Sequence, residues 1–127
     1  MSMPSHAACA LLIVPYAAAS LFHHVHNAEF IADYPNIPGW MTPAAVYAAW
    51  LVTTAVGMAG CVLLLKGKRL AGLALVALYG AAGLYSLAHY ALAPAAEHSL
   101  AMNLSIWLEV VTGLVLLSTA ALLMGRR

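Results

Sequence analysis

Residues 66–69 (KGKR) separate two long apolar runs, AAVYAAWLVTTAVGMAGCVLLL at 44–65 and LAGLALVALYGAAGLYSLAHYALA at 70–93. A helix needs about 20 mostly apolar residues to cross a bilayer, so each run is long enough to span one. Because the link between them is so short, the two helices must be antiparallel neighbours. This stretch therefore predicts a pair of adjacent membrane-spanning helices joined by a basic turn.

The remainder of the chain has the same apolar character. The 127 residues are 65% hydrophobic and 7% charged, with a mean hydropathy of +0.92, whereas about a quarter of the residues of a soluble domain are charged. Two further apolar runs lie at 7–30 and 99–124. We therefore predict an all-α fold, an integral membrane four-helix transmembrane bundle, in which residues 1–127 form a single domain with spans at 7–30, 44–65, 70–93 and 99–124.

The basic residues predict how this bundle is oriented. All five Lys and Arg residues lie either in the 66–69 turn or at positions 126 and 127. Loops rich in Lys and Arg stay in the cytoplasm, so we expect both termini to be cytoplasmic and the other two loops to face outward. Residues 1–6 lack the positive charge of a signal peptide, and the first span is expected to be retained.

The small excess of positive charge limits the partners. Five Lys and Arg residues face four Asp and Glu residues, and nucleic-acid binding needs clustered positive charge, so no nucleic-acid partner is expected. The lipid bilayer is the predicted partner. Faces rich in Gly, Ala and Ser, such as the one with Gly57 and Gly60, also fit packing into a homo-oligomer or a larger membrane complex. A non-enzymatic small subunit is therefore one alternative function.

Turn residues mark the ends of the predicted helices. Thr42 and Pro43 suit the N-cap and first position of the second span, and Pro94 is expected to end the third. The connection between the first two spans is rich in Pro, Asn and Gly. Its aromatic residues, Tyr34 and Trp40, are predicted to lie at the level of the lipid headgroups.

Residues 20–33 (SLFHHVHNAEFIAD) gather imidazoles and carboxylates near the outer end of the first span. At 100° per residue, successive positions three apart on a helix lie about 60° apart, so His and Glu side chains here can be neighbours. Imidazole suits Zn, Fe and Cu, and a carboxylate balances their charge. The predicted ligands of a divalent transition metal are His23, His26, Glu29, His89 and His98. The alternative is a structural or proton-handling network without a metal.

Glu109 lies well inside the fourth span, where an ionised carboxylate costs several kcal/mol unless it is paired or hydrated. We expect it to be protonated or paired with a histidine. Whether the site is catalytic is left open. If it is, a metal-bound water would attack a lipid-like substrate with Glu29 or Glu109 as base. Two further alternatives are a proton-coupled small transporter that uses Glu109, and a b-type haem or quinone-linked electron carrier with His89 as an axial ligand.

The segment 26–29 (HNAE), followed by Phe30, a Pro-rich outer turn and Trp40, resembles the bacterial membrane proteins named for an HXXEE motif. Phe30 stands where that motif has its second Glu. The resemblance covers about 20 residues of the first span and its loop. It implies a small multi-span protein of the bacterial inner membrane, with the His-rich face in the periplasm, and it implies no particular reaction.

Overall fold

The computed structural model describes residues 5–126, apart from the side chains at 5, 6, 8 and 9. Arg127 lies outside the described residues. This part of the chain is helical and contains no strand. Its elements are α1 (Ser5–Glu29), η1 (Ile31–Asp33), α2 (Pro43–Leu65), α3 (Arg69–Ala82), η2 (Gly83–Ala88), α4 (His89–Leu92), η3 (Ala95–Glu97) and α5 (Leu100–Gly125).

Three helices among the described residues are long and apolar enough to cross a membrane, which indicates an integral membrane protein. They are α2, α5 and the segment Arg69–Leu92, in which α3, η2 and α4 follow one another end to end. The fourth long helix, α1, has 25 residues and runs unbroken through Pro15. The all-helical prediction is confirmed, and helices long and apolar enough to cross a membrane lie where spans were predicted at 44–65, 70–93 and 99–124.

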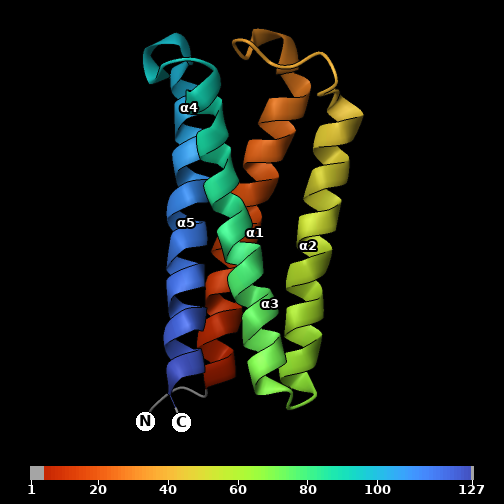
Figure 1. Cartoon of the computed structure of the whole chain (residues 1–127), viewed down its shortest axis with the longest axis vertical. Helices are drawn as coiled ribbons and strands as arrows, with labels where there is room; N and C mark the ends of the chain where they lie inside the picture. Colours follow the sequence, from red (N-terminus) through yellow and green to blue (C-terminus); the bar gives the residue numbers. More distant parts are fainter. Residues whose placement is uncertain (1–4, 127) are drawn as a thin grey trace.

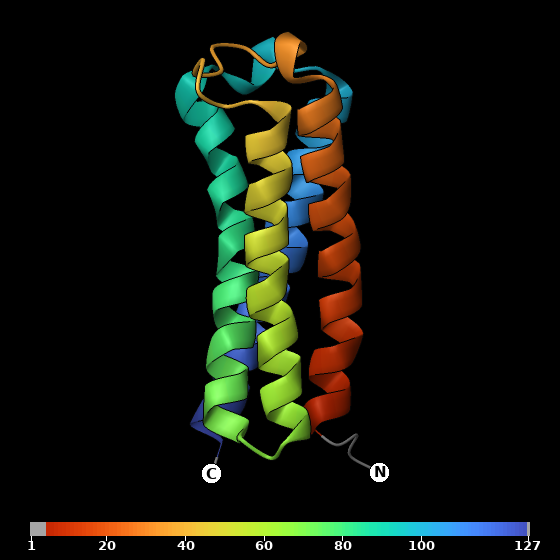
Figure 2. The same ribbon diagram turned by 90° about the vertical axis from the view of Figure 1, so that its right-hand side faces the viewer.

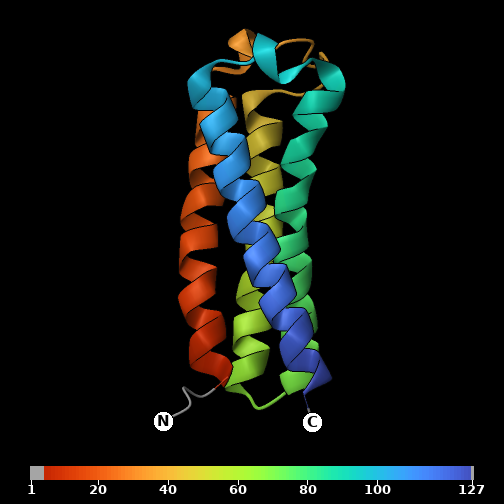
Figure 3. The same ribbon diagram turned by 90° about the vertical axis from the view of Figure 1, so that its left-hand side faces the viewer.

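The long helices lie side by side, and each packs against two others (Figure 1). α1 packs on α2 and α5, and α3 packs on the same two helices. The short α2–α3 turn lies at the same end of the molecule as the start of α1 and the end of α5, while the other two connections close the opposite end (Figures 2 and 3). We call that opposite end the loop end.

Side chains cap two of the helix starts, and the one at Thr42 and Pro43 is as predicted. The Thr42 side chain accepts a hydrogen bond from the backbone N–H of Ala45 at 3.2 Å, and Pro43 occupies the first turn. Ser99 caps α5 by accepting from the N–H of Met102 at 3.2 Å. Each cap satisfies a backbone donor that the first helical turn leaves free.

Glycines bring α3 and α5 into backbone contact. A Cβ atom added at Gly80 would lie 2.7 Å from the carbonyl oxygen of Gly113, and one added at Gly113 would lie 2.6 Å from that of Gly80. Gly83 meets the carbonyl oxygen of Glu109 in the same way, at 2.9 Å. Small residues allow this approach between membrane helices, and here it brings η2 close to Glu109.

The third span contains a 3₁₀ segment, η2, that its sequence did not predict. A 3₁₀ helix has three residues per turn, so side chains at i and i+3 lie directly above one another. Gly83, Ser86 and His89 have this spacing, and all three are buried. The tighter winding therefore turns one line of residues toward the interior near the loop end.

Candidate functional site

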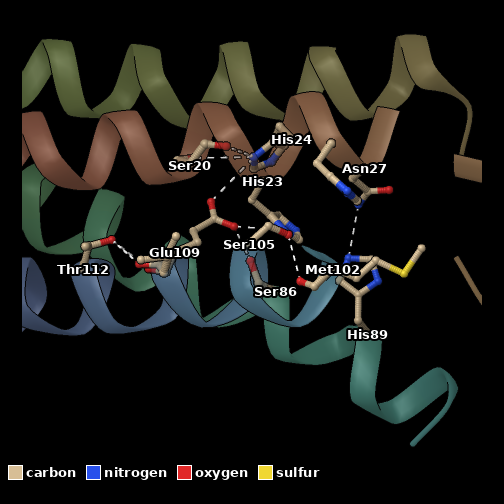
Figure 4. Close-up of polar contacts among 12 residues, drawn as sticks. Ser20, His23, His24, Asn27, Ser86, His89, Met102, Ser105, Glu109 and Thr112 are labelled. Carbon is tan, nitrogen blue, oxygen red and sulfur yellow. Dashed lines mark hydrogen bonds and ion pairs between the residues drawn. The ribbon is translucent and has the colours of Figure 1, made fainter. Parts of the chain in front are cut away.

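Glu109 is the centre of a buried polar cluster formed by three helical segments (Figure 4). Its side chain, on α5, is 1% exposed, and its Oε2 atom accepts a hydrogen bond from the Ser86 hydroxyl on η2. Two consecutive histidines of α1 lie next to it. His23 Nε2 is 3.7 Å from Oε2, and His24 Nδ1 is 3.6 Å from Oε1. This carboxyl therefore has polar neighbours from α1 and η2 deep inside the molecule.

Hydrogen bonds orient both imidazoles beside this carboxyl. The Ser105 hydroxyl donates to the carbonyl oxygen of Met102 at 2.9 Å, so it accepts from His23 Nδ1, which lies 3.1 Å away. His23 Nε2 is then the nitrogen with a free lone pair, and it faces Glu109. His24 Nδ1 donates to the carbonyl oxygen of Ser20 at 2.8 Å. A single proton, held by either the Glu109 carboxyl or His23 Nε2, would therefore be enough to link the two groups.

Asn27 and His89 form the next layer toward the loop end. The Asn27 amide nitrogen donates to His89 Nε2 at 3.2 Å, and the His89 ring lies edge-on to His23 with centroids 5.3 Å apart. Asn27 is 6% exposed, and its Oδ1 atom has no hydrogen-bond partner among the described residues. In Figure 4 this oxygen points away from His89. Because a buried acceptor without a partner is unfavourable, Asn27 provides a free bonding position.

Tyr34 connects this layer to His26 and was not predicted as a site residue. Its ring lies 4.9 Å from that of His89, and its hydroxyl is 2.9 Å from His26 Nδ1. Only 3% of Tyr34 is exposed, so its ring packs inside the protein, and its predicted position at the headgroup level stays a prediction. Burial raises the pKa of its phenol above the ordinary value of 10.0.

A pocket of about 590 Å³ lies beside these residues. Its polar end contains Glu109, Ser86, His23, His24, Asn27 and His89. The walls are largely apolar and include five alanines, from α2, the end of α3 and the η2–α4 segment, namely Ala45, Ala49, Ala82, Ala88 and Ala91. The volume falls in the range of sites for drug-sized molecules, and such sites commonly pair apolar walls with a few polar groups.

The structure brings together some of the predicted site residues and separates others. His23, His89 and Glu109 share the pocket, whereas His26 and His98 line a second hollow of about 680 Å³ at the loop end, together with Asp33 and Glu97. Glu29 is exposed and accepts a hydrogen bond from the Tyr47 hydroxyl on α2 at 2.7 Å. Glu29 is thus on the side of α1 that faces α2.

No group of three or more His, Cys, Asp or Glu residues within the described part of the chain is arranged to hold a metal ion. Around Glu109, the ring nitrogens of His23 and His24 lie 3.7 Å and 3.6 Å from the carboxylate oxygens. The predicted metal site, and the haem alternative, stay predictions.

Sequence reasoning missed His24 as a neighbour of Glu109, and it missed Asn27 and Tyr34 entirely. Glu109 was predicted to lie inside the fourth span, and it is buried there together with Ser105. A buried amide or phenol carries no periodic signal of its own in a sequence.

Comparison of the chain with protein-family models, curated proteins and solved structures gives no match.

Proposed function

We propose that all four long helices cross the bacterial inner membrane, as a four-helix bundle with both termini in the cytoplasm and the loop end in the periplasm. α1 is as long as its neighbours and packs against two of them. Lys66, Lys68, Arg69 and Arg126 all lie at the end opposite the loops. This charge distribution favours a cytoplasmic location for that end.

We further propose that the pocket binds a lipid-like small molecule and that Glu109 transfers a proton to or from it. The observation that carries this proposal is that the buried carboxyl lies at the polar end of an otherwise apolar pocket of about 590 Å³. A carboxyl inside a membrane helix is expensive to ionise, so such residues commonly have a function and a specific partner. Here the partners are Ser86 and His23.

The neighbours of Glu109 have distinct roles in this step. Glu109 holds the proton that passes to a basic atom of the ligand, and the Ser86 hydroxyl donates to the carboxylate that remains. His23 Nε2, which Ser105 orients toward the carboxyl, lies 3.7 Å from Glu109 Oε2 and exchanges a proton with it, so that Glu109 is reprotonated after the transfer. An acid–base group must lie within reach of the proton that it moves, and this arrangement meets that condition for a ligand in the pocket.

The same pocket and carboxyl also suit the proton-coupled transporter. The two functions differ in what leaves the site, because a transporter releases its ligand unchanged and an enzyme does not. Chemical analysis of ligand recovered after incubation separates them.

The test of the proton step uses dodecylimidazole, a lipid-soluble weak base, with the purified protein in vesicles. Difference infrared spectroscopy follows the C=O stretching band of a protonated carboxyl. We expect this band to be lost when dodecylimidazole binds and to persist with dodecylbenzene, which has no basic atom. Glu109→Gln should abolish the change, whereas Glu97→Gln, an exposed acid of the loop end, should leave it intact.

Two results would overturn the proposal. One is a band change that survives in Glu109→Gln or is lost in Glu97→Gln. The other is stoichiometric Zn, Fe or Cu in the purified protein that is lost on His26→Ala or His89→Ala, which would support the predicted metal centre instead.

A further inference from the structure

We propose that the pocket takes its ligand directly from the bilayer, through an opening between α2 and the η2–α4 segment, and that the ligand is a lipophilic alcohol or amine. This inference names the ligand class and the route for the site under the proposed function. It uses the pocket of that proposal and does not depend on proton transfer by Glu109.

The opening follows from the way α2 packs. α2 contacts α3 and α1 along much of its length but has few contacts with η2 or α4. In Figure 1, α2 and α4 diverge toward the loop end. The pocket occupies the space between them, because its lining includes residues of α2 and of both η2 and α4.

The exposure of the lining residues shows where the pocket reaches the surface. Trp40 and Tyr85 both line the pocket, yet they are 70% and 73% exposed. Ala49 of α2 is also exposed, and Leu51 and Val52 beside it are exposed apolar residues. The pocket thus opens on a flank of the helices that is apolar and faces lipid in a membrane-spanning chain.

The aqueous hollow at the loop end is a separate feature. It is lined by His26, Asp33, Glu97 and His98, among others, and it shares no lining residue with the pocket. The buried Tyr34 ring packs on His89, which lines the pocket, and bonds to His26, which lines the hollow. A ligand dissolved in water therefore has no open path from this hollow to Glu109 through the described residues.

Asn27 determines the chemistry of the ligand's polar group. Asn27 lines the pocket, its buried Oδ1 atom has no hydrogen-bond partner among the described residues, and its amide nitrogen is occupied by His89. A carbonyl oxygen can only accept, so a ligand that completes this site must donate a hydrogen bond. An alcohol or an amine does so, whereas an ether of the same shape does not.

The size of the pocket limits the apolar part of the ligand. At about 30 Å³ per non-hydrogen atom, the value for liquid water, about 590 Å³ holds about 20 such atoms. A head at Asn27 places the tail toward Trp40 at the opening. A single-chain amphiphile fits these limits.

The test is fluorescence quenching by 11-bromoundecanol in vesicles, because bromine quenches a nearby tryptophan. In the Trp50→Phe/Trp107→Phe protein, Trp40 at the opening is the reporter. We expect saturable quenching by the alcohol, with affinity about 3–10-fold higher than for its methyl ether, the difference that one net hydrogen bond provides. The Trp40→Phe/Trp50→Phe protein, which reports from Trp107 on α5, should show only the linear quenching of bromoundecanol dissolved in lipid.

Two pairs of variants test the route and the head group. Ala49→Phe fills the opening and should weaken saturable quenching at least 10-fold, whereas Ala48→Phe, an exposed neighbour that does not line the pocket, should not. Asn27→Leu should remove the preference for alcohol over ether, and Ala48→Phe, the control that leaves the pocket lining intact, should preserve it. Thermal unfolding of each variant checks that it is folded.

Equal affinity for alcohol and ether in the parent protein would overturn the ligand class without using any variant. Equal effects of Ala49→Phe and Ala48→Phe would overturn the route. Saturable quenching without the infrared change would overturn the proton step alone, and the infrared change without saturable quenching by the alcohol would overturn this inference alone.

Discussion

At the scale of the residue, the site depends on which polar atoms have partners and which do not. The Ser105 hydroxyl has a carbonyl acceptor of its own, and this fixes how His23 presents its free nitrogen to Glu109. Asn27 satisfies His89 with its amide nitrogen and leaves its oxygen free. Burial makes both arrangements consequential, because an unpaired polar atom in an apolar interior is costly.

Tyr34→Phe should lower the free energy of unfolding by about 1 kcal/mol, the net value of one hydrogen bond, since the phenyl ring keeps the packing on His89. Thermal unfolding in detergent measures the change. The matched control is Tyr85→Phe, which alters a side chain that is mostly exposed and should change stability by less than half as much. A larger loss in Tyr85→Phe would contradict the prediction.

The same tyrosine predicts a pH dependence. Burial raises the pKa of the Tyr34 phenol in the folded protein, so the phenol ionises more easily in the unfolded chain, near its ordinary pKa of 10.0. Its stabilising contribution is therefore complete below that pH and is lost as the pH rises toward the folded pKa. We expect the parent protein to lose more stability above pH 10 than Tyr34→Phe does. Parallel alkaline losses in the two proteins would contradict this.

At the scale of the element, the contact between α3 and α5 places Ser86 beside Glu109. The two helices touch backbone to backbone at Gly80 and Gly113, and η2 continues the contact through Gly83. This approach has no room for a side chain. The carboxyl and the hydroxyl are thus brought together by residues that lack polar side chains of their own.

Gly113→Ala should destabilise the protein by about 1–3 kcal/mol, because its methyl group would overlap the carbonyl oxygen of Gly80 and force the helices apart. Gly125→Ala is the control, since a Cβ at that position meets no atom within 4 Å. Thermal unfolding compares them. Equal stability of both variants would show that the α3–α5 contact is loose.

Helix ends could be predicted from the sequence, whereas the site's details could not. Thr42 and Pro94 act locally, through backbone chemistry that is the same in every helix. The 3₁₀ segment η2 packs against α5, which is remote in sequence. Tyr34 is buried for a similar reason, since the ring that it packs on, His89, belongs to another segment. His24 lies off the His23–His26 line and still reaches Glu109.

At the scale of the whole molecule, charge and polarity divide between the two ends. The basic residues lie at the end with the α2–α3 turn, where Arg69 donates to the carbonyl oxygen of Arg126 at 2.8 Å. The buried polar cluster lies in the half nearer the loop end. This separation allows orientation in the membrane and the chemistry of the site to depend on different residues.

The orientation predicts where reporters work in a bacterial host. Green fluorescent protein fused after residue 127 should fluoresce, because it folds in the cytoplasm, and alkaline phosphatase fused after residue 97 should be active, because it requires the periplasm. The exchanged fusions, with each reporter at the other position, should be silent. Activity of the exchanged pair would reverse the proposed topology.

The 3₁₀ winding of η2 sets the rotational position, about the helix axis, of the residues that follow it in the third span. A 3₁₀ helix advances about 120° per residue and an α-helix about 100°, so converting six residues from one form to the other turns everything beyond them by about 120°. His89, the first residue of α4, follows immediately after η2. Rewinding that single segment would swing its imidazole a third of a revolution away from Asn27 while α1, α2 and α5 stayed in place.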